Sequence, residues 1–307
     1  MNHAGEIAPL SRLARPHVAL ITTVEAVHIE NFADESGVAD AKAEIFEGLA
    51  SGGVAVLNRD NRWFERVRAA AAAAGARIVA FGANPRADAR LLSAEAEAGG
   101  TRVAAEIEGR RVAFTLAAPG RHLALNAVGA LACVAAAGGD VAQAAEAAAG
   151  WRPPEGRGAR WRVALPAGGA PVLLIDESYN ANPASVGAAL EVLAASRAEG
   201  RRIAVLGDMF ELGVHEAAMH AGLADHPALQ GIDAVATVGE RMRALDRALP
   251  AERRLGWFAD AEAAGAALAA ALGPGDAVMV KGSNAMRMGR VVEAVKAAGR
   301  AAPAEKA

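Results

Sequence analysis

The chain has 307 residues, 53% hydrophobic and 22% charged, so it can fill about two domain cores and is not of the disordered class. Its 35 acidic and 32 basic residues give a formal net charge of −3, which argues against the basic surface typical of nucleic-acid-binding proteins. A single cysteine, Cys133, rules out an internal disulfide framework. With no apolar run of membrane-spanning length and no visible secretory signal, we expect a cytoplasmic protein without a membrane span.

The first half alternates short apolar strands with amphipathic helices, a pattern typical of α/β domains. We predict strands at 18–24, 53–58 and 77–82 and helices at 38–49 and 62–74. The next segment, 90–117, is broken at two glycine-containing turns and predicts antiparallel hairpins. Ala-rich helices are expected at 121–138 and 141–149.

A Pro- and Gly-rich segment, 151–158, is the best linker candidate. The second half alternates more regularly and predicts strands at 172–176, 202–206, 234–238 and 277–280, with helices at 183–197, 216–223, 240–249, 261–272 and 286–298. We therefore expect domains at 1–152 and 153–300 and a tail at 301–307. The second domain should be a doubly wound parallel sheet, which binds ligands beyond the carboxyl ends of its strands. Asp176, Asp208 and Lys281 stand at such ends.

Lysine is scarce, because only Lys42, Lys281, Lys296 and Lys306 accompany the many arginines. Lysine has an amine that can deprotonate and react, whereas arginine does not. We expect Lys296 and Lys306 to be solvated, and we single out Lys42 and Lys281 as candidates for a chemical role. Taken alone, Lys42 is still best explained as a solvated helix lysine.

Two clusters of polar residues stand out in the first half. His28 and Glu30 follow the strand at 18–24, although a loop histidine without a role is the favoured interpretation of His28 alone. The long helix opens with Gly120-Arg121-His122 and carries Asn126 one turn later. A helix N-terminus with these residues suits an anion or nucleotide, and simple helix capping explains it equally well.

Two more clusters follow predicted strands in the second half. The turn at 176–183 reads Asp-Glu-Ser-Tyr-Asn-Ala-Asn-Pro and contains the only tyrosine, Tyr179. Capping of the next helix explains Asn182 but not the other polar residues of this turn. The loops at 207–213 and 281–287 each place a glycine at a strand end, which lets a ligand approach the backbone, or serves an ordinary turn.

Together, the order and spelling of these segments resemble the ATP-dependent Mur ligases of peptidoglycan synthesis. The matching pieces are NHxGEI from Asn2, HxE at 28–30, AKxEIF at 41–46, GRHxxxNA at 120–127, GRG at 156–158, DxSYNANP at 176–183, GDMxELG at 207–213 and KGSxxM at 281–286. The spelling is most similar to members that add D-alanyl-D-alanine to UDP-N-acetylmuramoyl-tripeptide. Siblings that add the third peptide residue, and folylpolyglutamate synthases, are disfavoured. A dehydrogenase is disfavoured too, because no G-x-G-x-x-G opens a helix after a strand.

The resemblance implies a partial P-loop-type central ATPase domain without its front strands, followed by a Rossmann-like C-terminal domain. It implies ATP and Mg²⁺ as cofactors, with an acyl phosphate formed from the tripeptide carboxylate and then attacked by the amine of the dipeptide. Lys42 would react with CO₂ to form a carbamate that helps to hold Mg²⁺, and His28 would be a neighbouring metal-site residue.

The resemblance also implies nucleotide and substrate contacts. Asn126 and His122 would lie near the nucleotide base. Arg157 would contact ATP from the linker, and Asp176 would contact its ribose or phosphates. The residues expected to face substrate or nucleotide are Asn180, Asn182, Lys281 and Ser283.

The chain also departs from the family pattern. No glycine is followed by lysine, so the P-loop is absent, and the family's metal-binding glutamate would fall before Met1. We therefore expect Met1 to be an internal methionine of a longer ligase, and we expect the chain as written to be a monomer that cannot ligate. The chain should be poorly soluble or partly molten at residues 1–150, since missing strands expose apolar faces and a sheet edge, whereas residues 158–300 should fold. The alternative is a non-catalytic protein that binds nucleotide or the UDP-linked precursor; the retention of Lys42 and His28 favours the ligase.

Overall fold

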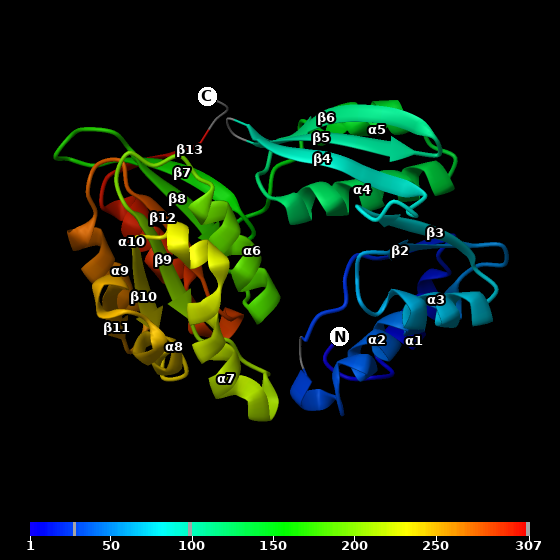
Figure 1. The fold of residues 1–307 in the computed structure, drawn as a ribbon, viewed down its shortest axis with the longest axis horizontal. Helices are drawn as coiled ribbons and strands as arrows, with labels where there is room; N and C mark the ends of the chain where they lie inside the picture. The colour runs from blue at the N-terminus through cyan, green and yellow to red at the C-terminus, as the bar shows by residue number, and fades with distance from the viewer. Residues whose placement is uncertain (27–28, 98–99, 305–307) are drawn as a thin grey trace. The chain divides into compact units, whose positions relative to one another are not determined.

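The computed structural model describes residues 1–26, 29–97 and 100–304. The chain divides into two compact units, Met1–Trp151 (unit 1) and Arg152–Ala307 (unit 2), and the division falls within the segment 151–158 (Figure 1). No helix among the described residues is both long and apolar enough to cross a membrane.

Unit 1 is built on a six-stranded sheet whose strands follow one another in sequence order. The strands are β1 (Val18–Ile21), β2 (Val54–Asn58), β3 (Arg77–Gly82), β4 (Ala89–Glu97), β5 (Gly100–Ile107) and β6 (Arg110–Leu116). The strands β1 to β4 pair in parallel, and β4, β5 and β6 form the predicted antiparallel hairpins. The parallel strands are rich in buried Val, Ala and Leu, as expected for strands covered on both faces.

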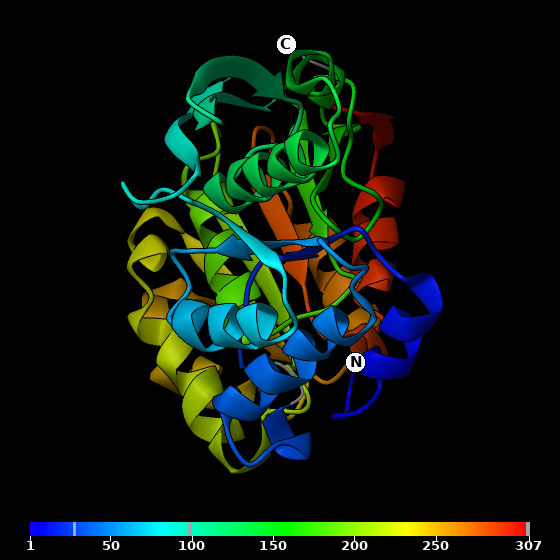
Figure 2. The same ribbon diagram turned by 90° about the vertical axis from the view of Figure 1, so that its right-hand side faces the viewer.

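Helices cover both faces of this sheet. They are α1 (Ile7–Ala14), α2 (Glu35–Ala43), α3 (Phe64–Ala73), α4 (Arg121–Ala136) and α5 (Val141–Ala148). Val38 of α2 and Phe64 of α3 pack in one core, and Ala124 and Val128 of α4 pack in the other with Ala145 of α5. Figure 2 shows α4 (green) and α3 (light blue) on opposite sides of β2 and β3.

The start of unit 1 differs from the sequence prediction. The helix predicted at 38–49 begins at Glu35, because Asp34 caps it by accepting from the amides of Ser36 and Gly37, and a 3-10 helix follows over Glu44–Gly48. The helix α1 was not predicted. Its N-terminus is held by Glu44, which accepts from the amides of Gly5, Ile7 and Ala8 at 2.5 to 3.1 Å.

Unit 2 contains a seven-stranded sheet in the order β11-β10-β9-β12-β8-β7-β13. The strands are β7 (Ala159–Ala164), β8 (Val172–Glu177), β9 (Arg202–Gly207), β10 (Ala234–Val238), β11 (Arg254–Phe258), β12 (Ala277–Lys281) and β13 (Arg300–Pro303). Five neighbouring strands, β11 to β8 in this order, are parallel, whereas β7 and β13 are antiparallel additions at one edge. The strands β7, β11 and β13 were not predicted, and β13 lies where a tail from residue 301 was expected.

The sheet of unit 2 is doubly wound. Its helices are α6 (Pro183–Ala194), α7 (Glu216–Ala221), α8 (Arg243–Ala248), α9 (Ala261–Ala271) and α10 (Gly289–Ala297). Leu190 of α6 and Leu245 of α8 pack on one face, whereas Leu268 of α9 and Val292 of α10 pack on the other. From β8 to β11 the connecting helices lie on the face covered by α6 and α8. The chain then returns by α9 on the other face, and β12 inserts between β8 and β9. The carboxyl ends of β8, β12 and β9 are thereby brought side by side.

Candidate functional site

The loops that follow β8, β12 and β9 meet at the carboxyl edge of the unit 2 sheet, where the strand order reverses. Open α/β sheets bind ligands at such a position. Asp176 and Glu177 end β8, Lys281 ends β12, and Asp208 follows β9 directly. Three of these residues, Asp176, Lys281 and Asp208, are no more than 4% exposed, so their polar groups need partners within the protein.

Asp176 holds the linker against the sheet. Its Oδ2 accepts from the amide of Gly156 at 2.9 Å, and its Oδ1 accepts from the amide and hydroxyl of Ser178 at 3.1 and 2.6 Å. The amide of Gly158 donates to the backbone oxygen of Asp176 at 2.7 Å. One carboxylate oxygen and the backbone oxygen of Asp176 therefore fix the backbone on either side of Arg157, while the other carboxylate oxygen holds the turn at Ser178.

The segment after β12 braces the turn after β8. Three consecutive backbone carbonyls of that turn each accept from a different side chain. Asn284 Nδ2 donates to the oxygen of Tyr179 at 3.2 Å, and Lys281 Nζ donates to that of Asn180 at 2.9 Å. Ser283 Oγ lies 3.5 Å from the oxygen of Ala181. The two segments are more than 100 residues apart in the sequence, and these hydrogen bonds join them.

A buried charge pair lies beside this brace. Lys281 and Glu177 are partners in the β12–β8 register, and their Nζ and Oε2 atoms are 3.7 Å apart. Burial lowers the pKa of Lys281 and raises the pKa of Glu177, while the attraction between them opposes both changes. Burial also lowers the pKa of Arg160, on the neighbouring β7, to about 10. Sequence analysis included Glu177 in the polar turn at 176–183 without giving it a role. It missed Arg160, because β7 was not predicted.

The two asparagines of the turn mostly serve local backbone structure. Asn182 Oδ1 accepts from the amide of Ser185 at 2.9 Å, and Ser185 Oγ accepts from the amide of Asn182 at 3.0 Å, which completes a capping box at α6. Asn180 Oδ1 accepts from the amide of Ala181 at 2.9 Å, and its side chain lies at an exposed position. The capping explanation of Asn182 thus has a direct structural basis, and its contact with substrate remains a prediction.

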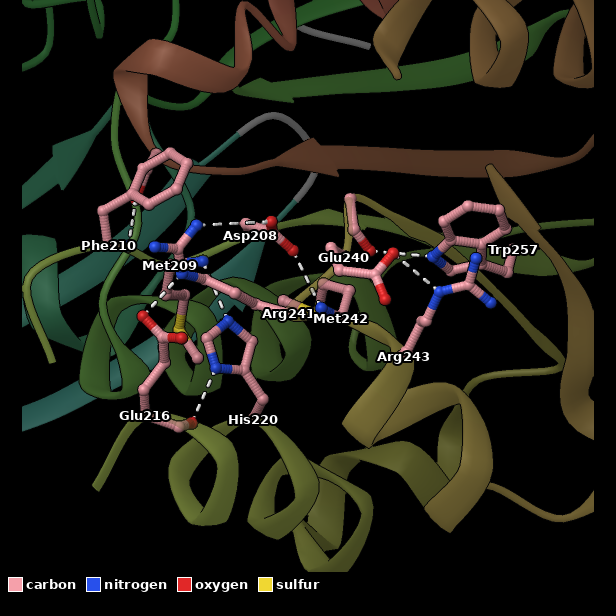
Figure 3. Close-up of polar contacts among 12 residues, drawn as sticks. Asp208, Met209, Phe210, Glu216, His220, Glu240, Arg241, Met242, Arg243 and Trp257 are labelled. Carbon is pink, nitrogen blue, oxygen red and sulfur yellow. Dashed lines mark hydrogen bonds and ion pairs between the residues drawn. The ribbon is translucent and has the colours of Figure 1, made fainter. Parts of the chain in front are cut away.

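The loop after β9 is held by hydrogen bonds to its backbone amides (Figure 3). The amide of Met209 donates to His220 Nε2 at 3.0 Å, and the amide of Phe210 donates to Ser283 Oγ at 2.9 Å. The carboxylate of Asp208 accepts from the amide of Met242 at 2.8 Å, and burial raises the pKa of this carboxyl. Because His220 Nε2 is an acceptor, its proton resides on Nδ1, which lies 2.8 Å from the backbone oxygen of Glu216.

In unit 1, the lysine singled out by sequence is half-buried. Lys42 Nζ donates to the backbone oxygen of Thr23 at 2.7 Å, and burial lowers the pKa of this amine against the attraction of Glu25. Thr23 Oγ1 in turn donates to Glu25 Oε1 at 2.7 Å and accepts from Asn61 Nδ2 at 3.1 Å. His28 lies outside the described residues. Within those residues, no group of three His, Cys, Asp or Glu side chains is arranged to hold a metal ion.

The nucleotide-base candidates lie on α4. His122 and Asn126 are both at exposed positions, and their spacing of four places them on one face of the helix. The helix begins after Gly120, whose φ of +125° is unfavourable for other residues and whose amide donates to Thr101 Oγ1 at 3.2 Å. The helix N-terminus therefore has no side-chain cap of its own.

Comparison with known proteins explains this arrangement. The model of the Mur ligase middle domain matches residues 1–134, and the model of the Mur ligase glutamate ligase domain matches residues 161–284. The chain belongs to the Mur ligase family. Both units therefore have a counterpart in the family, and they occur in the family's order.

One curated relative is the UDP-N-acetylmuramoyl-tripeptide–D-alanyl-D-alanine ligase of Escherichia coli K12, which is 33% identical over 298 residues. That match covers 96% of this chain and 63% of the relative. A crystal structure of MurF from Acinetobacter baumannii is similar with a TM-score of 0.83 and 25% identity, covering 96% of this chain and 63% of that one. MurF from Thermotoga maritima in complex with ADP, at 24% identity and a TM-score of 0.81, shares the fold; the match covers 96% of this chain and 65% of that one. The chain thus spans less than two thirds of the length of these proteins.

Proposed function

We propose that this chain is the ATP- and amine-handling part of a ligase that joins D-alanyl-D-alanine to UDP-N-acetylmuramoyl-tripeptide, in cytoplasmic synthesis of peptidoglycan precursors. The observation that carries the proposal is the 33% identity, over 96% of this chain, to an Escherichia coli enzyme of that name. The turn at Asp176–Pro183 supports it, because this is one of the two most specific spellings in the chain, with GDMxELG at 207–213, and it lies at the ligand-binding edge of the unit 2 sheet.

The reaction must bring an anionic carboxylate to a polyanionic triphosphate. Phosphoryl transfer is therefore catalysed chiefly by positioning and by cationic groups that offset the charge. The carboxylate of the tripeptide would attack the γ-phosphate to form an acyl phosphate, whose carbonyl is then attacked by the dipeptide amine with release of phosphate. In this chain Arg157 is an exposed cation of the linker, and Asp176 holds its backbone in place.

Lys42 fits the carbamate role implied by the family resemblance. Its neutral amine would attack CO₂ through Nζ and lose a proton, which converts a cation into an anion. Burial, which lowers the pKa of Lys42, increases the fraction of neutral amine available for this step. A bound Mg²⁺ would supply charge neutralisation for the phosphates, and the carbamate together with His28 would help to hold it. His122 and Asn126 would contact the nucleotide base from their shared face of α4.

The test is formation of the pentapeptide product, which is detected by mass spectrometry, with phosphate release measured in parallel. The 307-residue chain and a version extended upstream in its own gene as far as a P-loop are each supplied with ATP, Mg²⁺ and both substrates. We expect product only from the extended protein and only when both substrates are present. A folded extended protein that binds ATP and forms no product would refute the ligase.

A second candidate is a non-catalytic protein that binds nucleotide or the UDP-linked precursor. It is favoured by one observation, the lack of any glycine followed by lysine in the chain. This candidate predicts that the gene encodes no P-loop upstream of the Met1 codon. It also predicts that ATP or the precursor binds to the 307-residue chain without being turned over.

A further inference from the structure

Unit 2 contains three arginines stacked on aromatic rings, at distances of 3.5 to 4.4 Å from the guanidinium carbon to the ring centre. The pairs are Arg157 with Tyr179, Arg241 with Phe210, and Arg243 with Trp257. Stacking places the planar guanidinium face against the ring and leaves its N–H donors at the edge. Such an arginine is well oriented to bind an anion, provided that its charge is not already satisfied.

The three arginines differ in whether a carboxylate of the protein pairs with them. Arg241 Nε lies 2.5 Å from Glu216 Oε2, and Arg243 Nε lies 2.8 Å from Glu240 Oε2 (Figure 3). The charge of each of these two arginines is therefore already paired with a carboxylate of the protein. Arg157 is at an exposed position, and no carboxylate in the part of the chain that the structure describes forms an ion pair with it.

The backbone on both sides of Arg157 is fixed by the turn that carries Tyr179. Besides the two bonds to Asp176 described above, the amide of Tyr179 donates to the oxygen of Gly156 at 3.0 Å. Gly156 has a φ of +75°, and a Cβ there would lie 2.9 Å from the Cβ of Tyr179, so only glycine allows this close approach. The ring and the backbone of Tyr179 thus contact consecutive residues of the linker.

The turn itself is held from the other side by side chains at and just after the end of β12. Asn284 binds the carbonyl of Tyr179, and Lys281 binds that of Asn180. The backbone from which the ring projects is therefore held in place without a ligand. The stack is assembled before any anion arrives, which removes part of the ordering cost of binding.

From this arrangement we propose that Tyr179 is a positioning residue, whose ring orients the Arg157 guanidinium toward a bound polyphosphate. The identity of that polyphosphate as the triphosphate of ATP rests on the proposed function. The orienting role itself needs only a phosphate anion. Tyr179 is the only tyrosine of the chain, which makes it a unique spectroscopic probe of its own stack.

The test uses the 307-residue chain, first labelled with 3-fluorotyrosine and followed by ¹⁹F NMR. Inorganic tripolyphosphate and ATP are titrated separately, and each should shift the single resonance. The shift should disappear in Arg157→Ala and in Arg157→Lys, because the lysine ammonium has no plane to stack on the ring. Affinities of unlabelled variants are then measured by calorimetry.

The variants separate orientation from mere stability. Tyr179→Phe keeps the ring and should bind tripolyphosphate as the parent chain does, whereas Tyr179→Leu should bind about three- to tenfold more weakly at an unchanged melting temperature. Trp257→Leu is the matched control, since it removes an arginine–aromatic stack from β11, at the opposite end of the sheet, and should leave the affinity unchanged.

The outcomes distinguish this proposal from the proposed function. Equal affinities of Tyr179→Leu and Tyr179→Phe for both probes would overturn the positioning role while leaving ATP binding intact. Arg157-dependent binding of tripolyphosphate without binding of ATP would support the positioning role toward a polyphosphate other than ATP, while the ligase is tested separately with the extended protein. Binding of neither probe would overturn the positioning role, whereas the ligase is refuted only by the extended protein.

Discussion

The two ring nitrogens of His220 make different hydrogen bonds, and substitution by glutamine or asparagine tests them separately. The side chain is fully buried, and its Nε2 accepts from the amide of Met209 at 3.0 Å. Glutamine can place an oxygen at the position of Nε2, whereas the amide of asparagine is too short. His220→Asn therefore leaves the buried amide of Met209 without an acceptor, which costs about 1–3 kcal/mol.

The second bond of the ring is expected to matter less. His220 Nδ1 donates to the oxygen of Glu216, which lies one helical turn earlier in α7. This carbonyl keeps the helical amide of residue 220 as a partner when the ring is lost. The expected order of unfolding free energies is parent, then His220→Gln within about 1 kcal/mol, then His220→Asn.

Urea titration of 3-fluorotyrosine-labelled protein measures this difference in unit 2 alone, because Tyr179 lies there. Hydrogen exchange at the Met209 amide is the second readout, and it should accelerate in His220→Asn but not in His220→Gln. Equal destabilisation by the two variants, with unchanged exchange at Met209, would show that the ring acts by packing and not as an acceptor.

Three further predictions concern the lysines and the cysteine. Lys281→Met should cost unit 2 about 2–4 kcal/mol because it leaves the largely buried Glu177 without its ion-pair partner, and adding Glu177→Gln should recover most of this in urea titrations. Burial raises the pKa of Glu177 above its unfolded value, so protonation favours the folded state, and the single variant should become more stable as the pH falls through that folded pKa; a flat profile would exclude this cause. ¹³C-labelled bicarbonate should give a carbamate NMR signal that Lys42→Arg abolishes and Lys296→Arg retains, and loss of the signal in both would refute the assignment to Lys42. Burial raises the pKa of the Cys133 thiol to about 11, so disulfide-exchange reagents should react about 100-fold more slowly with folded than with urea-unfolded protein, and equal rates would contradict its burial.

The alternation of apolar segments was sufficient to predict most of the parallel strands and the helices between them. Features that depend on distant residues were not predictable in this way. The helix α1 contains Pro9 and lacks a local cap, and it is held by Glu44, more than 30 residues later. The strand β13 consists of exposed residues and exists because β7 offers an antiparallel edge.

In the candidate site, too, local segments could be predicted from the sequence, whereas contacts between distant segments could not. The motif spelling located the turn at 176–183 and the segment at 281–286, but it could not show that the second binds the backbone of the first. Lys281 and Ser283 were expected to face substrate, and the structure places both in internal hydrogen bonds, where their contact with substrate stays a prediction. Backbone carbonyls leave no trace in a sequence, so a side chain that recognises them is indistinguishable from one that recognises a ligand.

The strand order of the two units has a consequence for synthesis on the ribosome. In unit 1 each strand pairs with the one made just before it, so the sheet can grow as the chain emerges. In unit 2 the middle strand β12 is made after β8, β9, β10 and β11, and until residue 281 appears β8 and β9 have no common neighbour. The growing chain must therefore keep the apolar edges of β8 and β9 from aggregating until the codons of β12 are read.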